Sequence, residues 1–143
     1  MFVTLDDLDT LARTIYGEAR GEFPRTGIAA LMAVANVVLN RSKRPPFWKG
    51  TVRDICLQPK QFSCWSMHDP NFRLLQNAIR GEKIFDLCWH VAKNVLEEKW
   101  PDITKGADHY HAISITPSWA MGKIPLIALG GHLFYQLYKE NVR

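Results

Sequence analysis

The sequence predicts a mainly helical protein with a small β element in its C-terminal half. Apolar residues recur every three or four positions through most of residues 5–100, which is the spacing of amphipathic helices. Caps, prolines or glycines bound most of these segments. After residue 102 the helical pattern weakens, and two short apolar and aromatic runs at 109–113 and 133–137 are typical of strands. The length of 143 residues suffices for a hydrophobic core, and we expect one domain over residues 1–143.

The first helix is expected over residues 5–19. Thr4 can cap its N-terminus, and acidic residues in the first turn favour a helix start. Its apolar residues share one face, which predicts the side that is buried. These residues are Leu8, Leu11, Ala12, Ile15 and Ala19.

The second helix is expected from a cap at Thr26 to about Lys43. It is apolar on nearly all sides, which is typical of a helix in the centre of a protein. Pro45 and Pro46 end it, because proline cannot continue a helix. Further helices are predicted over residues 51–57, 71–80 and 84–100, with a polar and aromatic loop at 58–69.

Two acidic residues four positions apart, Glu18 and Glu22, stand at the end of the first predicted helix. At about 100° per residue, Glu18 projects within about 20° of Leu11 and Glu22 within about 20° of Ile15. Both carboxyl groups are therefore expected to face the apolar side. An apolar setting favours the protonated form of an acid, which can then donate a proton to a leaving oxygen. Solvated carboxylates at a helix end are the competing interpretation.

Glycines stand close to Glu18 on both sides, at Gly17 and Gly21. Because glycine has no side chain, another segment can approach the backbone closely at these positions. We therefore expect the end of the first helix to be a contact point.

Several short motifs follow one another in a set order along the chain. They are ARTIYGEARGE (12–22), GIAALMAVANVVLNR (27–41), QPKQFSCW (58–65), GADHY (106–110), PSWA (117–120) and GHLFY (131–135). In this order and spacing they resemble the SleB/CwlJ-type cell-wall hydrolase family, which includes spore cortex-lytic enzymes and peptidoglycan-cleaving domains of phages and bacteria. The resemblance runs from about Leu8 to Tyr138, and GEARGE and QFSCW are specific in combination.

The resemblance implies a lysozyme-like helical domain that cleaves peptidoglycan strands between N-acetylmuramic acid and N-acetylglucosamine. In the family the first Glu of the GEARGE motif is catalytic, and Glu18 occupies this position. The second acid corresponds to Glu22, which is expected to act electrostatically, bind substrate or support the loop. Neither a metal nor a cofactor is implied. The other residues expected to bind substrate or support the site are Gln61, Phe62, Ser63 and Tyr110.

Two forms of glycan cleavage fit these residues. If Glu18 acts as acid and then as base, the sugar's own hydroxyl attacks and gives an anhydro product, as in lytic transglycosylases. The resemblance makes this reaction the first choice. If Glu22 is a second catalytic carboxylate, water attacks and the enzyme is a muramidase. The spacing of the two acids leaves both reactions open.

Histidine and cysteine residues suggest two other catalytic classes. His109, His111 and His132 invite a zinc amidase, but the chain has no His-Glu-x-x-His motif and His-x-His lacks a defined third ligand. Cys64 beside a histidine would suit a cysteine peptidase, for which the resemblance gives no support. We therefore expect structural histidines, or histidines that line the cleft.

The remaining cysteines and two tryptophans have mainly structural interpretations. Cys56, Cys64 and Cys88 fit neither a zinc knuckle nor a redox pair, so reduced, buried thiols are expected. Trp65 and Trp119 could stack on sugar rings, although core packing is the commoner role of tryptophan.

The net charge of +4 comes partly from a local group of basic residues after the second helix. A basic surface there would suit an anionic polymer, either nucleic acid or cell wall. The rival function is therefore a helical module that binds nucleic acid through its phosphates. We favour peptidoglycan as the partner and expect no nucleic acid. The basic residues are Arg41, Lys43, Arg44 and Lys49.

The N-terminal residues lack the basic and apolar regions of a secretory signal, and no apolar run is long enough to span a membrane. We therefore expect a monomeric protein that is synthesised in the cytoplasm and acts on the cell wall. A phage or prophage endolysin, released by a holin-like partner that permeabilises the membrane, is the expected setting.

Overall fold

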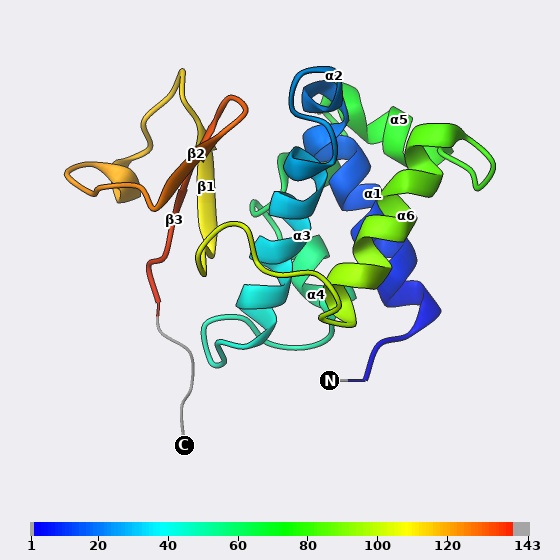
Figure 1. Cartoon of the computed structure of the whole chain (residues 1–143), viewed down its shortest axis with the longest axis horizontal. Coiled ribbons are helices and arrows are strands. Elements are labelled where there is room, and N and C mark those ends of the chain that lie inside the picture. Colours follow the sequence, from blue (N-terminus) through cyan, green and yellow to red (C-terminus); the bar gives the residue numbers. More distant parts are fainter. Residues whose placement is uncertain (1, 139–143) are drawn as a thin grey trace.

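The computed structural model describes residues 2–138 and shows a helical body beside a small sheet (Figure 1). This is the mainly helical architecture that the sequence predicts. The helices are α1 (Leu5–Ala19), α2 (Phe23–Thr26), α3 (Ile28–Ser42), α4 (Val52–Leu57), α5 (Pro70–Asn77) and α6 (Lys83–Leu96), with 3-10 turns η1 (Arg20–Glu22), η2 (Ser63–Trp65) and η3 (Ser118–Ala120). The strands are β1 (His109–Ala112), β2 (Ile127–Leu129) and β3 (His132–Tyr135).

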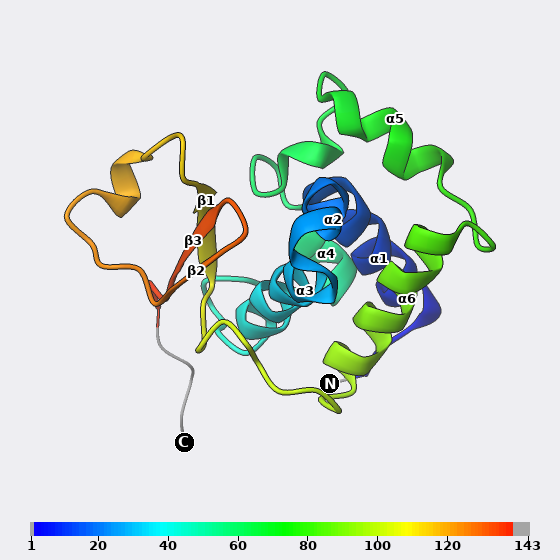
Figure 2. The same cartoon turned by 45° about the horizontal axis from the view of Figure 1, so that its top comes forward.

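Helix α1 is the centre of the helical body, because it contacts α3, α4, α5 and α6. Its predicted apolar face is buried, with Leu11 and Ile15 fully inaccessible to solvent. Helix α3 lies between α1 and the sheet in both views (Figures 1 and 2). Nearly all of α3 from Ala30 to Arg41 is buried, as expected for a helix that packs on two sides.

The starts of two helices follow from local capping, and a third differs from the prediction. Thr4 and Asp7 form a reciprocal capping box at α1, and Thr51 and Asp54 form another at α4. The predicted cap at Thr26 is wrong. Thr26 ends α2, where its hydroxyl donates to a backbone carbonyl one turn earlier, and a glycine with φ of 62° precedes α3.

Two helices end earlier than their apolar patterns suggest. Helix α5 stops at Asn77 instead of residue 80, because Nη1 of Arg13 binds the carbonyls of Leu75 (2.5 Å) and Ala78 (2.9 Å) and holds the chain there in an extended course. Helix α6 stops at Leu96 instead of residue 100, because Glu98 takes a left-handed conformation with φ of 55°. Tertiary contacts and backbone turns therefore set these two ends.

The sheet has the order β1-β3-β2, and both strand pairs are antiparallel. Strand β2 is an addition to the two predicted strands. It has only three residues, but the Gly130–Gly131 pair between two apolar runs is a hairpin signal. Phe134 of β3 packs with Ala33 and Val37 of α3, and this small second core joins the sheet to the helices.

The prediction of a basic surface after α3 is wrong for two of its four residues. Arg41 and Arg44 are 4% and 2% exposed and belong to the interior. Lys43 forms an ion pair with Glu98 at 2.6 Å, which leaves Lys49 as the exposed member without a described ion-pair partner in residues 2–138. The observation that favoured a nucleic-acid-binding surface is thereby largely removed. Separately, no helix within residues 2–138 has both the length and the apolar character needed to cross a membrane.

Candidate active site between the helices and the sheet

Glu18 lies in the last turn of α1, where three segments of the chain meet at its carboxyl group. The hydroxyl of Tyr110, on β1, donates to Oε1 of Glu18. The backbone N–H of Cys64, in η2, donates to Oε2 over a longer distance of 3.4 Å. One acidic group therefore connects the helical body, the 58–69 loop and the sheet.

Tyr110 is held among other rings, which orient its hydroxyl toward Glu18. Its ring stacks on Phe134 at 5.3 Å, meets His132 edge to face at 5.3 Å and lies 6.5 Å from Phe62. Burial raises the pKa of the Tyr110 phenol well above its ordinary value, and the adjacent Glu18 charge raises it further. Tyr110 therefore stays protonated and acts as a constant hydrogen-bond donor to Glu18.

Gly17 explains how η2 comes close enough to reach Glu18. A Cβ atom at this position would lie 2.7 Å from Cβ of Cys64 and 2.8 Å from Cδ2 of Leu75. Only glycine fits such an approach without movement. The expected contact point is thus observed at Gly17, whereas a Cβ at Gly21 would meet no atom of residues 2–138 within 4 Å.

Substituting Gly17→Ala is expected to push η2 away from α1, which breaks the hydrogen bond from Cys64 N–H to Glu18. We expect a loss of about 1–3 kcal/mol in the free energy of unfolding, the usual cost of overpacking. Urea unfolding followed by circular dichroism measures this change. Gly21→Ala is the matched control, and a destabilisation by Gly21→Ala as large as that by Gly17→Ala would contradict the steric explanation.

Glu22 reaches the same region from η1, although the 3-10 turn replaces the helical path from which its direction was predicted. A Cβ built on Gly130, in the β2–β3 turn, would lie only 3.1 Å from Oε2 of Glu22. Arg25 also binds this oxygen, at 2.7 Å. The Glu22 side chain is 16% exposed, so it lies between the helices and the hairpin turn as a partly buried acid.

Both acids line one small pocket, and for Glu18 this agrees with its predicted direction toward the apolar side of the helix. Its volume is about 10 Å³, close to the minimum that one water molecule needs. The helical body supplies one part of the lining and the sheet the other, and the lining includes both charged and apolar side chains. The lining residues are Glu18, Ala19, Glu22, Ala30, Val34, Tyr110, Leu129, His132 and Phe134.

The other predicted site residues do not all lie at the Glu18 pocket. Phe62 is 4% exposed and lies near Tyr110 as part of the support for the pocket. Gln61 and Ser63 are exposed and do not line the Glu18 pocket. Ser63 instead borders a neighbouring surface pocket together with Trp65. Trp65 also donates from its ring nitrogen to Thr14 (2.9 Å), which indicates a packing role.

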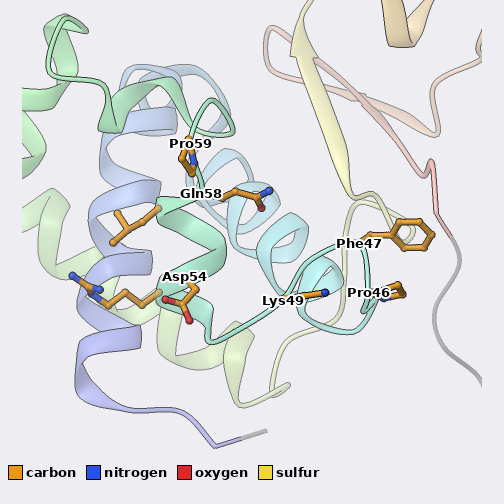
Figure 3. Close-up of a pocket in the computed structure, with 8 residues that line it drawn as sticks. Pro46, Phe47, Lys49, Asp54, Gln58 and Pro59 are labelled. Carbon is orange, nitrogen blue, oxygen red and sulfur yellow. The ribbon is translucent and has the colours of Figure 1, made fainter.

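A wider surface pocket of about 460 Å³ lies away from these acids, between the loop after α3 and the end of α4 (Figure 3). Phe47 and Lys49 come from the loop, and Gln58 and Pro59 follow the helix. Gln58 and Pro59 also line the pocket beside Ser63, so the two hollows adjoin. Neither contains Glu18.

Two of the three histidines have structural partners. Nδ1 of His109 lies 2.9 Å from Oδ1 of Asp108, and Nε2 of His111 lies 2.9 Å from the Tyr135 hydroxyl. Trp119 packs against both histidine rings at 5.0 and 5.6 Å. Within residues 2–138, no three His, Cys, Asp or Glu side chains come together as metal ligands.

The three cysteines are free and buried, as expected. Burial raises the pKa of the Cys64 thiol far above its ordinary value, and Glu18 raises it further. Burial likewise raises the pKa of Cys56 to about 12. These protonated thiols are poor nucleophiles, because the thiolate is the reactive form.

Two buried charged residues, Arg41 and Asp108, support the site but were not expected there. The Asp108 carboxylate binds Arg44 (3.0 Å), His109 and two backbone N–H groups just after β3. Arg41 binds the carbonyl oxygen of Asp108 at 2.8 Å. Because Asp108 stands two residues before Tyr110, these contacts set the start of β1. The one signal in the sequence was the presence of an acid in the GADHY motif.

Comparison with known proteins identifies the family. The profile of a family described as cell wall hydrolase matches residues 26–135. The chain belongs to the cell wall hydrolase family. The resemblance drawn from the sequence motifs is thereby confirmed. The matched range begins after Glu18 and Glu22. These two acids are connected to the matched part of the chain by the pocket, which they line together with residues of that part.

The chain is similar to the spore cortex-lytic enzyme of Bacillus subtilis (strain 168), with 26% identity over 129 residues. The similarity covers 90% of this chain and 37% of that protein, so the chain spans little more than a third of the relative's length.

Two solved structures share its fold. The catalytic domain of the Bacillus cereus SleB protein has a TM-score of 0.68 and 22% identity, covering 93% of this chain and 91% of that one. The catalytic domain of the germination-specific lytic transglycosylase SleB from Bacillus anthracis has a TM-score of 0.70 and 22% identity, covering 92% and 95%. The predicted fold, a lysozyme-like helical domain with a small sheet, is confirmed.

Proposed function

We propose that this chain cleaves the glycan strands of peptidoglycan between N-acetylmuramic acid and N-acetylglucosamine, as a lytic transglycosylase with Glu18 as its one catalytic acid. The observation that carries the proposal is the Glu18 carboxyl group in a small pocket, held by a permanent hydrogen-bond donor on the sheet. Membership of the cell wall hydrolase family supports the substrate class. The name of the Bacillus anthracis relative, a lytic transglycosylase, supports the reaction type.

In the proposed reaction, protonated Glu18 donates its proton to the glycosidic oxygen as the bond to the muramic acid C1 breaks. Positive charge then develops on the sugar ring, as in other glycoside cleavages. The C6 hydroxyl of the same sugar attacks C1, and the Glu18 carboxylate accepts the proton of that hydroxyl. The products are a free hydroxyl on N-acetylglucosamine and a 1,6-anhydro muramic acid, and Glu18 ends protonated as it began.

The contacts of Glu18 assign its two oxygens different parts in this proposal. Oε1 receives the hydrogen bond from Tyr110 and is the anchored oxygen. Oε2 has the 3.4 Å contact with Cys64 N–H, so it is the oxygen better able to carry and transfer the proton. When Glu18 becomes a carboxylate, both donors stabilise the negative charge.

A second reaction, hydrolysis by a muramidase, is favoured by one observation. Glu22 lines the same pocket as Glu18, which places a second carboxyl group near the reacting bond. In this case Glu22 would activate water or stabilise the charged sugar ring. Its contacts with Arg25 and with the Gly130 turn favour the supporting role that the transglycosylase reaction leaves for it.

Digestion of purified peptidoglycan, with the products analysed by mass spectrometry, tests the proposed function. Anhydro-muropeptides are expected. Muropeptides with a reducing muramic acid would replace the transglycosylase by a muramidase and make Glu22 the partner of Glu18. Free stem peptides would contradict cleavage of glycosidic bonds, and the absence of any product would contradict the proposed function as a whole.

Substituting Tyr110→Phe is expected to lower kcat by about 10- to 100-fold, because a donor aimed at the catalytic carboxyl group is lost while the ring packing remains. Release of anhydro-muropeptides over time measures the change. His111→Phe, which removes a polar group from the same strand but not from the pocket, is the control. Equal losses in both variants would show that the sheet, and not the Tyr110 hydroxyl, is responsible.

The biological setting extends this proposal. We infer that the protein acts on the cell wall as a monomer, and an endolysin released by a holin-like partner stays a prediction from the sequence. Lysis of a host after expression with and without such a partner measures this role.

A further inference from the structure

Arg41 is a buried cation whose surroundings are unusual for an arginine. Only 4% of it is exposed, and its guanidinium lies 5.0 Å from the ring centres of both Trp48 and Phe62. Nε donates to the Asp108 carbonyl, whereas Nη1 is buried without a hydrogen-bond partner among residues 2–138. Such an unsatisfied group is costly, so its retention calls for an explanation.

The contacts of Arg41 lead to Glu18 by two routes. On one side, the guanidinium packs on Phe62, whose ring lies beside Tyr110 and which is two residues before Cys64. On the other side, the hydrogen bond to Asp108 fixes the chain at the start of β1. Both hydrogen-bond donors of the Glu18 carboxyl group therefore belong to segments that Arg41 holds.

Glu18 is also one of the acidic groups in the surroundings of the Arg41 charge. Burial lowers the pKa of the Arg41 guanidinium, and the opposing influences come from Tyr110, Asp108, Cys56 and Glu18. Arginine nevertheless stays protonated in proteins. A fixed positive charge in this interior stabilises a nearby carboxylate more strongly than it would in water.

We propose that Arg41 is a positioning residue for the reaction of Glu18: it holds the Phe62 loop and the start of β1 against α1, and its buried charge stabilises the Glu18 carboxylate formed after proton donation. This inference rests on the proposed function. It gives a reason for the unpaired Nη1, because a guanidinium placed between two rings keeps its charge available to the site.

Several other titratable groups face Glu18 or Arg41 and must be considered in any pH experiment. Around Glu18 they are Glu22 on η1, Cys64 on η2, and Tyr110 and His132 on the sheet, and around Arg41 they are Cys56 on α4, Tyr110 and Asp108. Of these groups, His132 and Glu22 are the ones to replace, as His132→Gln and Glu22→Gln, in parallel titrations.

The test compares Arg41→Met, which removes the charge, with Arg41→Lys, which keeps the charge but loses the planar group. Two quantities are measured: the pH dependence of kcat on soluble glycan strands, and the titration midpoint of the Glu18 carboxyl group by carbon NMR of labelled protein. In Arg41→Met, both the alkaline limb of kcat and the NMR midpoint are expected to move up by about half a pH unit or more. In Arg41→Lys, the NMR midpoint of Glu18 is expected to stay unchanged. The value of kcat is expected to fall about 10-fold, because lysine does not hold the Phe62 loop and the start of β1 in place.

Lys43→Met is the matched control, because it removes an equal charge from the exposed end of the same helix. An unchanged Glu18 midpoint in Arg41→Met, or an equal shift in Lys43→Met, would overturn the electrostatic part of the inference. Wild-type kcat in Arg41→Lys would overturn the positioning part, even if Arg41→Met does not fold. If the wild-type protein releases no anhydro product, the proposed function fails, and the NMR midpoints still decide whether the Arg41 charge acts on Glu18.

Discussion

Substituting Glu18→Gln is expected to reduce the release of anhydro-muropeptides by about three orders of magnitude, the middle of the range of about 10²- to 10⁴-fold for loss of a general acid. Glutamine has the same shape and can still accept the hydrogen bond from Tyr110, but it carries no transferable proton. The fold should be retained, because the contacts around Gly17 and the core of α1 are unchanged. Initial rates on purified peptidoglycan and a urea unfolding curve measure both properties.

Glu22→Gln is the control for this experiment, since it makes the same chemical change in the second acid of the same pocket. A transglycosylase with one catalytic acid retains more than about a tenth of its rate in this variant, because supporting contacts are individually modest. If Glu22→Gln is as inactive as Glu18→Gln, the reaction uses two carboxylates. If Glu18→Gln keeps its activity, Glu18 is not the catalytic acid.

The largest expected effect on stability comes from Asp108→Asn, which replaces the buried carboxylate that binds Arg44 by a neutral amide. Both side chains of this ion pair are almost inaccessible, at 0% and 2% exposed. Breaking a buried ion pair by removing one charge typically costs about 3–5 kcal/mol. Urea unfolding near neutral pH measures the loss, which is a large part of the about 5–15 kcal/mol that stabilises most domains.

Asp108 also makes the free energy of unfolding depend on pH. Burial alone would raise the pKa of Asp108, but hydrogen bonds from His109 and from the N–H groups of Leu137 and Tyr138 hold it below its ordinary value. The unfolded chain then binds the proton more readily, so the Asp108 contribution is present above about pH 4 and is lost as the pH falls further toward the native pKa. Asp108→Asn should therefore lose less stability than the wild type over this acidic range.

Glu98→Gln is the matched control, because the pair of Lys43 and Glu98 is short, at 2.6 Å, but exposed. Its loss is expected to cost less than about 1 kcal/mol. A similar cost for Asp108→Asn and Glu98→Gln would mean that burial of the Arg44 pair has no special importance.

The helices were predictable where local chemistry decides them. The apolar face of α1, the cap at Thr4 and the short helix predicted at 51–57 depend on residues that lie close together in the sequence. The end of α5 was not predictable, since it depends on Arg13, which is 62 residues away from its partner Leu75. Short-range patterns contain no information about such a contact.

In the candidate site too, features set by local sequence were predictable and features set by distant contacts were not. The direction of Glu18 followed from helical geometry, the closeness of Gly17 to another segment followed from the missing side chain of glycine, and the importance of Tyr110 followed from the family resemblance. The interior location of Arg41 did not follow, because an arginine at the end of an apolar helix is usually solvated. Its burial depends on Trp48, Phe62 and the Asp108 carbonyl, which come together only in the folded protein.

The hydrogen bonds of Glu18 also determine when the site can form during synthesis. Its two donors lie 46 and 92 residues further along the chain, at Cys64 and Tyr110. The ribosome synthesises the N-terminal part first, so Glu18 leaves the ribosome long before the two groups that orient its carboxyl group. Contacts between such distant residues form late, because the intervening chain must be ordered before they close. A nascent or truncated chain that lacks β1 would therefore carry the acid without its anchored geometry, and the proposed glycan cleavage would begin only after β1 has been synthesised.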